Sequence, residues 1–287
     1  MRTRTLWTTV GVAAAAVIAA GAIAVPFVVG GTEAAGARPT ASTSSAPTVP
    51  PVAASALAAL PEAQYSAVIG GLMPSDRTVT SDTVFRLTAD APLFGADRRT
   101  PVARFAAKDF LQQPTTVVGL RRDGDWELVL TPARRQLPSK AGGSGAAAQT
   151  SAWVPVSSLR KVSTPTSRVV ISTKDQTVSI VTASGRVSQR FDAGVGTAGT
   201  PTPTGVIGYL EQRYVDPTQG TGDHPIQLTS LHSSAADEPY GGHDGGLIGL
   251  HWNATTSGAV SHGCVRLDAE AVAAVDALPL GTLVTVE

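Results

Sequence analysis

Arg168-Val169-Val170-Ile171-Ser172 begins a series of three short segments in which apolar and polar side chains alternate. Thr177-Val178-Ser179-Ile180-Val181 is the second segment, and a Ser-Gly turn leads into the third, Arg186-Val187-Ser188-Gln189-Arg190-Phe191. Side chains along a strand point alternately to the two faces of a sheet, so this spacing predicts an antiparallel meander. We therefore expect a mainly β domain over residues 167–287.

The end of the chain predicts one helix and one further strand. Asp268 is a suitable N-cap for a helix over residues 269–278, and Glu270 lies in its first turn, where the helix dipole favours a negative charge. The proline and glycine within residues 279–281 end this helix, and the apolar residues 283–286 predict a last strand.

Cys264 is the single cysteine of the 287 residues, so it cannot form an intramolecular disulfide. It lies in Ser261-His262-Gly263-Cys264-Val265-Arg266-Leu267, and His251 precedes that block by a gap of nine residues. A thiol of ordinary pKa is mostly protonated at neutral pH, and a histidine that accepts its proton makes it nucleophilic. We expect Cys264 to be a nucleophile and His251 its general base.

Two backbone amides and a second histidine complete this predicted site. The N–H groups of Gly263 and Cys264 are the expected donors to a developing oxyanion, because glycine permits a close approach of the backbone. His262 is the other candidate base. Adjacent side chains on an extended loop tend to point apart, so we expect His262 to be structural or to line the pocket.

The Ser-His-Gly-Cys-Val-Arg block, with His251 and Pro203-Thr204-Gly205 before it, resembles the L,D-transpeptidase catalytic domain (YkuD-type) of bacterial cell-wall synthesis. The resemblance covers about residues 167–287. It implies a mostly β fold, with the nucleophile Cys264 and the base His251 beside a groove under a flexible lid. It also implies that the enzyme is acylated by carbapenems.

The resemblance further implies the substrate, the stem tetrapeptide of peptidoglycan. Cys264 would attack the carbonyl of the third residue, a diamino acid, and release D-alanine. The side-chain amine of a neighbouring stem would resolve the thioester and give a 3→3 cross-link. Such an enzyme serves peptidoglycan biosynthesis, cell-wall organization and cell shape.

Two features differ from the usual pattern of that family. Relatives usually have glycine after the base histidine and a longer gap before the cysteine block, whereas this chain has Trp252 and nine residues. Arg266 is expected either to hold a substrate carboxylate or to form an ion pair with Asp268 or Glu270. The predicted substrate-contacting residues are Ser261, His262, Arg266 and Trp252.

Three further histidines raise the question of a metal site. His224, His232 and His243 could supply zinc ligands together with the histidines near Cys264, but none of these residues has the close spacing of known ligand pairs. We expect no metal and no cofactor. The three histidines are expected to be exposed residues of a lid over 208–247, a stretch rich in Gly, Asp, His and Pro.

Residues 83–162 predict a separate small β domain. Strands are expected at 84–87, 116–120 and 126–130, and an Asp-Gly turn joins the last two. A closing Trp153-Val154-Pro155 segment follows a Gly-rich and Ala-rich loop. The pattern resembles bacterial SH3-like barrels of cell-wall proteins; a β spacer without a ligand is the alternative.

The N-terminus has the features of an export signal. Arg2 and Arg4 precede an apolar run from Val10 to Val29, long enough to span a bilayer. Residues 1–30 are therefore predicted to be a cleaved signal peptide or a retained membrane anchor. Residues 31–82 are predicted to be an Ala/Thr/Ser/Pro-rich linker with a short helical pattern at 57–78.

Charge is distributed unevenly along the chain, although the formal net charge is zero. Residues 82–162 contain 12 Lys/Arg and 7 Asp/Glu, whereas residues 163–287 contain 6 Lys/Arg and 12 Asp/Glu. The neutral total argues against nucleic acid as the main partner. The basic middle part suggests an anionic wall polymer as a partner.

Three hypotheses of function follow. The first is an exported, extracytoplasmic L,D-transpeptidase that acts on stem peptides in the cell wall. The second is a cell-wall cysteine peptidase or amidase, in which water resolves the thioester. The third is a catalytically inactive wall-binding protein.

Overall fold

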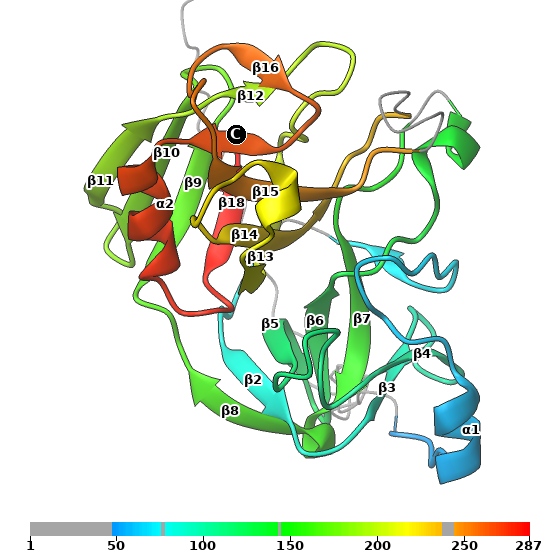
Figure 1. Ribbon diagram of the computed structural model, residues 1–287. Helices are drawn as coiled ribbons and strands as arrows, with labels where there is room; N and C mark the ends of the chain where they lie inside the picture. The colour runs from blue at the N-terminus through cyan, green and yellow to red at the C-terminus, as the bar shows by residue number, and fades with distance from the viewer. Residues whose placement is uncertain (1–47, 76–77, 143–144, 237–243) are drawn as a thin grey trace, which may run out of the picture. The chain divides into compact units, whose positions relative to one another are not determined.

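The computed structural model describes residues 48–75, 78–142, 145–236 and 244–287. The predicted signal or anchor at 1–30 lies outside these residues. Within them, no helix combines the length and the apolar character needed to cross a membrane. Strands predominate, so the predicted mainly β fold is confirmed (Figure 1). The helices are α1 (Ala54–Ala59), α2 (Ala269–Asp276) and short 3₁₀ turns at Pro138–Lys140, Val156–Ser158 and Pro217–Gln219.

The C-terminal sheet has eight strands in the order β11-β10-β9-β18-β13-β14-β15-β17. The predicted meander forms its first three strands, and antiparallel pairing joins them. Two pairs are parallel, β18 with β9 and β15 with β17. A separate parallel pair joins β12 to β16. The bounds are β9 (Ser167–Ser172), β10 (Thr177–Thr182), β11 (Val187–Asp192), β12 (Val195–Gly196), β13 (Val206–Tyr214), β14 (Ile226–His232), β15 (Leu247–Trp252), β16 (Ala259–Ser261), β17 (Val265–Leu267) and β18 (Leu283–Val286).

The N-terminal sheet also has eight strands, with β4-β3-β7-β6-β5-β2-β8 as the main order and β1 paired to β7. The three strands predicted at 84–87, 116–120 and 126–130 are present, and the SH3-like assignment remains a prediction. The bounds are β1 (Met73–Pro74), β2 (Val84–Leu87), β3 (Ala91–Phe94), β4 (Pro101–Phe105), β5 (Thr116–Asp123), β6 (Trp126–Thr131), β7 (Thr150–Pro155) and β8 (Leu159–Ser163).

The segment before the N-terminal sheet differs from its predicted helical pattern. The helix spans 54–59, whereas residues 63–72 are not helical. Ala63, Ile69 and Leu72 are buried in the apolar cluster of the N-terminal sheet. Their helix-like spacing therefore reflects burial of successive apolar side chains along an irregular segment, and Pro74 pairs in β1.

Apolar packing joins strands from both sheets. Tyr209 of β13 and Leu283 of β18 are buried in the same cluster as Phe94, Trp126 and Trp153 of the N-terminal sheet. A second cluster lies within the C-terminal sheet and includes the apolar face of α2. These buried side chains fix the strands that carry the sequence-predicted site.

β14 and much of β13 lie inside the stretch that was predicted to be a lid, and that prediction is wrong for them. Gln227, Thr229 and Ser230 are fully buried, and each finds a hydrogen-bond partner. Thr229 Oγ1 donates to Ile248 O at 2.6 Å, and Ser230 Oγ donates to Gln149 Oε1 at 2.6 Å. A strand can be buried although its composition is typical of a loop, where polar side chains find partners as those of Thr229 and Ser230 do.

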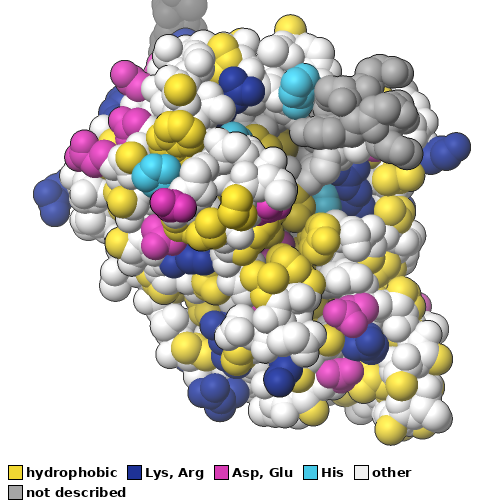
Figure 2. All heavy atoms as spheres, viewed as in Figure 1, with side chains coloured by type: hydrophobic (Ala, Val, Ile, Leu, Met, Phe, Trp, Pro, Cys, Tyr) yellow, Lys and Arg dark blue, Asp and Glu magenta, His cyan; other side chains and the backbone are white. Residues whose placement is uncertain are grey.

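The predicted C-terminal helix is confirmed as α2, which packs against β14, β15 and β17 (Figure 1). Asp268 accepts a hydrogen bond from Ala271 N at 2.8 Å, as expected of an N-cap. Asp and Glu side chains gather on the surface over β11 and α2 (Figure 2), in line with the acidic composition of this part of the chain.

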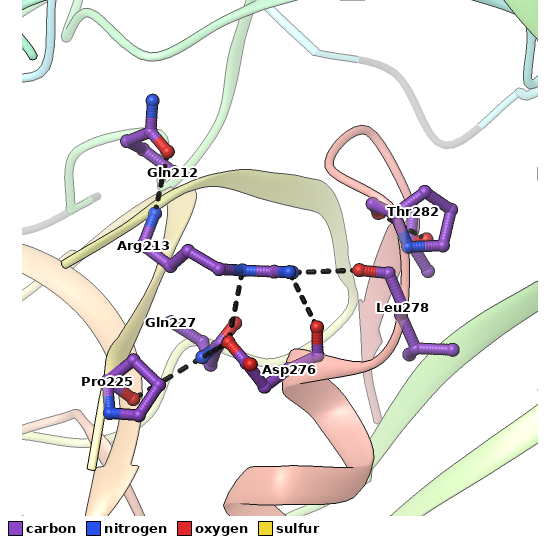
Figure 3. A network of polar contacts seen from close by, with 8 residues as sticks. Gln212, Arg213, Pro225, Gln227, Asp276, Leu278 and Thr282 are labelled. Atoms are coloured by element: carbon purple, nitrogen blue, oxygen red, sulfur yellow. Dashed lines mark hydrogen bonds and ion pairs between the residues drawn. The ribbon is translucent and has the colours of Figure 1, made fainter. Parts of the chain in front are cut away.

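Arg213 of β13 binds the C-terminal end of α2 (Figure 3). Its guanidinium donates to the carbonyl oxygens of Asp276 at 2.6 Å and Leu278 at 2.8 Å, and it lies 3.4 Å from the Asp276 carboxylate. Gln227 donates to the same carboxylate at 2.8 Å. A cation at this position satisfies helix carbonyls and complements the helix dipole.

We predict that Arg213→Ala lowers the free energy of unfolding by about 1–3 kcal/mol, because it removes charge-assisted hydrogen bonds from partly buried carbonyls. Urea unfolding would measure the change. Arg190→Ala is the matched control, since its exposed ion pair with Asp175 at 3.6 Å should contribute less than about 1 kcal/mol. Equal effects of the two variants would contradict the role of Arg213.

Candidate active site

β15 and β17 place the predicted nucleophile and base on neighbouring parallel strands. Leu250 pairs with Val265, and His251 pairs with Arg266. Leu250 and Val265 are buried in the core, so the alternation of side chains turns His251 and Arg266 toward the other face. Cys264 directly precedes β17 and has the same parity as Arg266.

A cleft of about 1040 Å³ opens on that face. His251, Cys264, Arg266, Ser261 and His262 all line it, so the structure brings these sequence-predicted residues together. On the face seen in Figure 2, histidine side chains lie among apolar side chains. Residues before β15 and from the N-terminal part of the chain also line the cleft, among them Tyr65, Val68, Phe110, Leu111 and Arg134.

Cys264 is partly buried, and its sulfur contacts the backbone of β15. The Gly249 N–H donates to Sγ at 3.5 Å, and the thiol donates to Leu247 O at 3.7 Å. Burial raises the pKa of Cys264, while the Gly249 N–H and the positive charge of Arg266 act in the opposite direction. The net direction favours the neutral thiol before substrate binds.

His251 is held by the backbone of its own strand. Its Nδ1 lies 2.9 Å from Trp252 O, and a carbonyl only accepts, so Nδ1 carries the proton and Nε2 is the basic nitrogen. Burial lowers the pKa of His251; the bond to Trp252 opposes this shift and Arg266 reinforces it. The resting pair is therefore a thiol and a neutral imidazole, and the ion pair must form during attack.

The loop that carries Cys264 is fixed by side chains and by one unusual backbone conformation. Ser261 Oγ accepts from Gly263 N at 3.2 Å and donates to Cys264 O at 2.5 Å. Thr202 Oγ1 donates to Gly263 O at 2.8 Å. Gly263 has φ of 113°, which side-chain-bearing residues rarely adopt.

These contacts define roles that the sequence did not reveal for two residues. Ser261 is buried and closes the cysteine loop, and the Gly263 N–H, predicted as an oxyanion donor, here donates to Ser261. Thr202 was missed, although the Pro203-Thr204-Gly205 segment that directly follows it was part of the resemblance. Its contact with Gly263 spans 61 positions in sequence, and no local pattern could indicate it.

Arg266 has no acidic partner within 4.0 Å among the described residues. Its Nε is buried and lacks a hydrogen-bond partner in that part of the chain. Asp268 instead caps α2, so the predicted alternative of an Arg266–Asp268 ion pair is not seen.

The other predicted residues lie in different places. The side chain of Trp252 lies on the same side of β15 as that of Leu250 and packs against the core cluster. It stacks on His224 at a ring-centroid distance of 5.6 Å and is not among the residues that line the cleft. His262 is exposed at the cleft. His232 is buried on β14, which corrects its assignment as an exposed lid residue. His243 lies outside the described residues, and within them no group of three His, Cys, Asp or Glu is suited to a metal.

The part of the chain that contains Cys264 and His251 also matches a known protein family. Residues 166–286 match the model of the YkuD family, the L,D-transpeptidase catalytic domain. The match covers less than half of the 287 residues. The resemblance inferred from the cysteine block is confirmed for the YkuD domain.

Solved structures similar to this chain include three L,D-transpeptidases. One from Mycobacterium tuberculosis H37Rv has 16% identity and a TM-score of 0.34, and the match covers 60% of this chain and 90% of that chain. L,D-transpeptidase 3 from Mycobacterium tuberculosis has 17% identity and a TM-score of 0.34, with coverage of 60% and 91%. The enzyme from Stackebrandtia nassauensis has 18% identity and a TM-score of 0.30, with coverage of 45% and 58%. No curated protein sequence matches the chain.

We predict that alkylation of Cys264 by iodoacetamide accelerates with rising pH, with an inflection above the ordinary thiol pKa of about 8.5. Burial disfavours the thiolate of Cys264 and also the imidazolium of His251, and both shifts favour the neutral pair. Intact-mass measurement at a series of pH values would follow the single thiol. A rate that is already maximal at pH 6 would contradict this prediction.

We predict that Gly263→Ala slows alkylation of Cys264 and destabilises the protein by about 1–3 kcal/mol, because alanine is strained at positive φ. The added Cβ would also lie 3.0 Å from Ile248 Cδ1. Gly199→Ala is the control, since its Cβ would meet no atom within 4 Å. Wild-type alkylation in Gly263→Ala would show that this conformation is not needed.

Proposed function

We propose that the chain is an L,D-transpeptidase that cross-links peptidoglycan through a thioester on Cys264. The observation that carries the proposal is the convergence of Cys264, His251 and Arg266 on one cleft of the domain that matches the YkuD family. A single cysteine, partly buried and held against the backbone of β15, is well placed for a rigid nucleophile.

The first half-reaction breaks the amide between the third residue of a stem tetrapeptide and its terminal D-alanine. Cys264 Sγ forms a bond to the carbonyl carbon while its proton passes to His251 and then to the departing amine of D-alanine. The product is a thioester on Cys264 and free D-alanine. The Cys264 N–H is the proposed donor to the oxyanion, with Gly263 as second donor if its bond to Ser261 opens.

The second half-reaction transfers the acyl group to a neighbouring stem peptide. Its side-chain amine attacks the thioester carbonyl, loses a proton to His251, and releases Cys264, which regains its proton. The result is a 3→3 cross-link. Arg266, without an acidic partner among the described residues, is proposed to bind a carboxylate of the stem peptide.

Peptidoglycan lies outside the cytoplasmic membrane, so this function requires export, and we propose that the apolar run at 10–29 directs it. The basic composition of residues 82–162 supports a contact with an anionic wall polymer as a further part of the proposal. Loss of residues 83–162 without any change in wall retention would refute that contact.

We predict that the protein forms one covalent adduct with a carbapenem, detected by intact mass. Cys264→Ala should form none, and His251→Gln should acylate about 10²–10⁴-fold more slowly, as expected for loss of a general base. Folded wild-type protein with a free thiol but no adduct would overturn the proposal and favour the inactive wall-binding alternative.

Products from stem tetrapeptides would then separate the two enzymatic hypotheses. The proposed transpeptidase releases D-alanine and yields a cross-linked dimer when an acceptor stem is present. A peptidase would release D-alanine and leave only the shortened stem. Mass spectrometry of the products, with Cys264→Ala as the blank, makes this distinction.

A further inference from the structure

Arg134, just after β6 of the N-terminal sheet, reaches into the C-terminal sheet. It is 7% exposed, and its Nε donates to His232 Nδ1 at 2.8 Å. His232 Nε2 must then carry the proton, which it donates to Pro132 O at 2.6 Å. Burial lowers the pKa of His232 to about 4, and the charge of Arg134 acts in the same direction, so the ring remains neutral at physiological pH.

Arg134 and a neighbour also hold the segment that leads into β15. Arg134 Nη2 donates to Gly245 O and, at 3.1 Å, to Gly246 O. Ser139 donates to the Asp244 carboxylate through both its backbone N–H at 2.8 Å and its hydroxyl at 2.7 Å. Residues 244–246 are therefore fixed by side chains and backbone from the segment after β6.

The next residues of the same strand contact the sulfur. Leu247 pairs with His232 across β14 and β15, and its carbonyl accepts from the Cys264 thiol at 3.7 Å. Gly249 donates to Sγ at 3.5 Å. A continuous series of contacts thus runs from Arg134 through the start of β15 to the nucleophile.

The energetics argue against a purely stabilising role for this guanidinium. Arg134 Nη1 is buried and has no hydrogen-bond partner among the described residues. Burying a guanidinium with an unpaired N–H costs free energy that an apolar side chain of similar size would not. The Arg134 guanidinium has a fixed planar geometry and donates to three separate acceptors. This arrangement suits the positioning of those acceptors better than stabilisation of the fold.

We propose that Arg134, assisted by Ser139, is a positioning residue that holds the start of β15 so that its backbone frames Cys264. The importance of Arg134 for catalysis rests on the proposed function. It makes the segment after β6 part of the active-site framework, in addition to any role of the N-terminal sheet as a spacer or a polymer-binding module.

The test is the pH dependence of iodoacetamide alkylation of Cys264 in the full-length protein. Loss of Arg134 should loosen the Gly249 N–H contact, which lowers the pKa of the thiol. In Arg134→Met we expect the inflection to move upward by about 0.5 pH unit, the size of one modest hydrogen bond. Arg134→Lys should recover part of the shift. The neighbouring groups Arg266, His251 and His262 stay unchanged.

Controls separate positioning from stability. Arg135→Met removes the same charge from the next, exposed residue and should alkylate as the wild type does. Ser139→Ala, on an exposed residue, should shift the inflection in the same direction with little change in urea unfolding, and it decides the question if Arg134→Met does not fold. Unshifted profiles in the folded variants would overturn the inference.

The outcome is independent of the proposed function, because alkylation requires no transpeptidase activity. Carbapenem acylation of the wild type tests that function separately. If the wild type is acylated, the acylation rate of Arg134→Met should be lower by about tenfold, as expected for a displaced nucleophile. Equal acylation of the two proteins would overturn the inference even though the function stands.

Discussion

The parallel pairing of β15 with β17 is the constraint on which the site depends. It places His251 beside Arg266 in register, and the alternation of side chains sends Leu250, Val265 and Leu267 into the core. The core residues therefore fix the orientation of the polar residues on the opposite face. A slip of one residue would bury His251 and expose Leu250, so the apolar core itself selects the catalytic arrangement.

Burial then tunes the chemistry of that face. Cys264 and His251 both lose solvation, which favours the uncharged form of each, and Arg266 adds a positive field that favours the thiolate and disfavours the imidazolium. The charge separation needed for attack is thus suppressed in the resting cleft. A substrate whose carboxylate neutralises Arg266 would relieve part of this cost for His251.

Local patterns in the sequence predicted the parts of the fold that depend on local physics. Alternation identified β9, β10 and β11, and Asp268 predicted the start of α2. The Ser-His-Gly-Cys block indicated the site because it holds the single cysteine of the chain, with His251 shortly before it. Trp252 was predicted to contact the substrate, but it has the parity of Leu250 and packs against the core cluster.

What the sequence did not predict depends on contacts between distant residues. The stretch that contains β14 is rich in Gly, Asp, His and Pro and therefore reads as a loop. Its buried Thr229 and Ser230 form hydrogen bonds with Ile248 and Gln149, which lie outside β14. Thr202 and Arg134 lie far from Cys264 in sequence, and neither belongs to a motif.

The topology of the sheet sets a lower limit on the length of the connection between β15 and β17. The connection spans residues 253–264, about the dozen residues that a parallel crossover requires. Pairing of β16 with β12 and the contacts of Ser261 and Thr202 fix residues 259–264 of this connection, so a change of its length is accommodated most easily within residues 253–258.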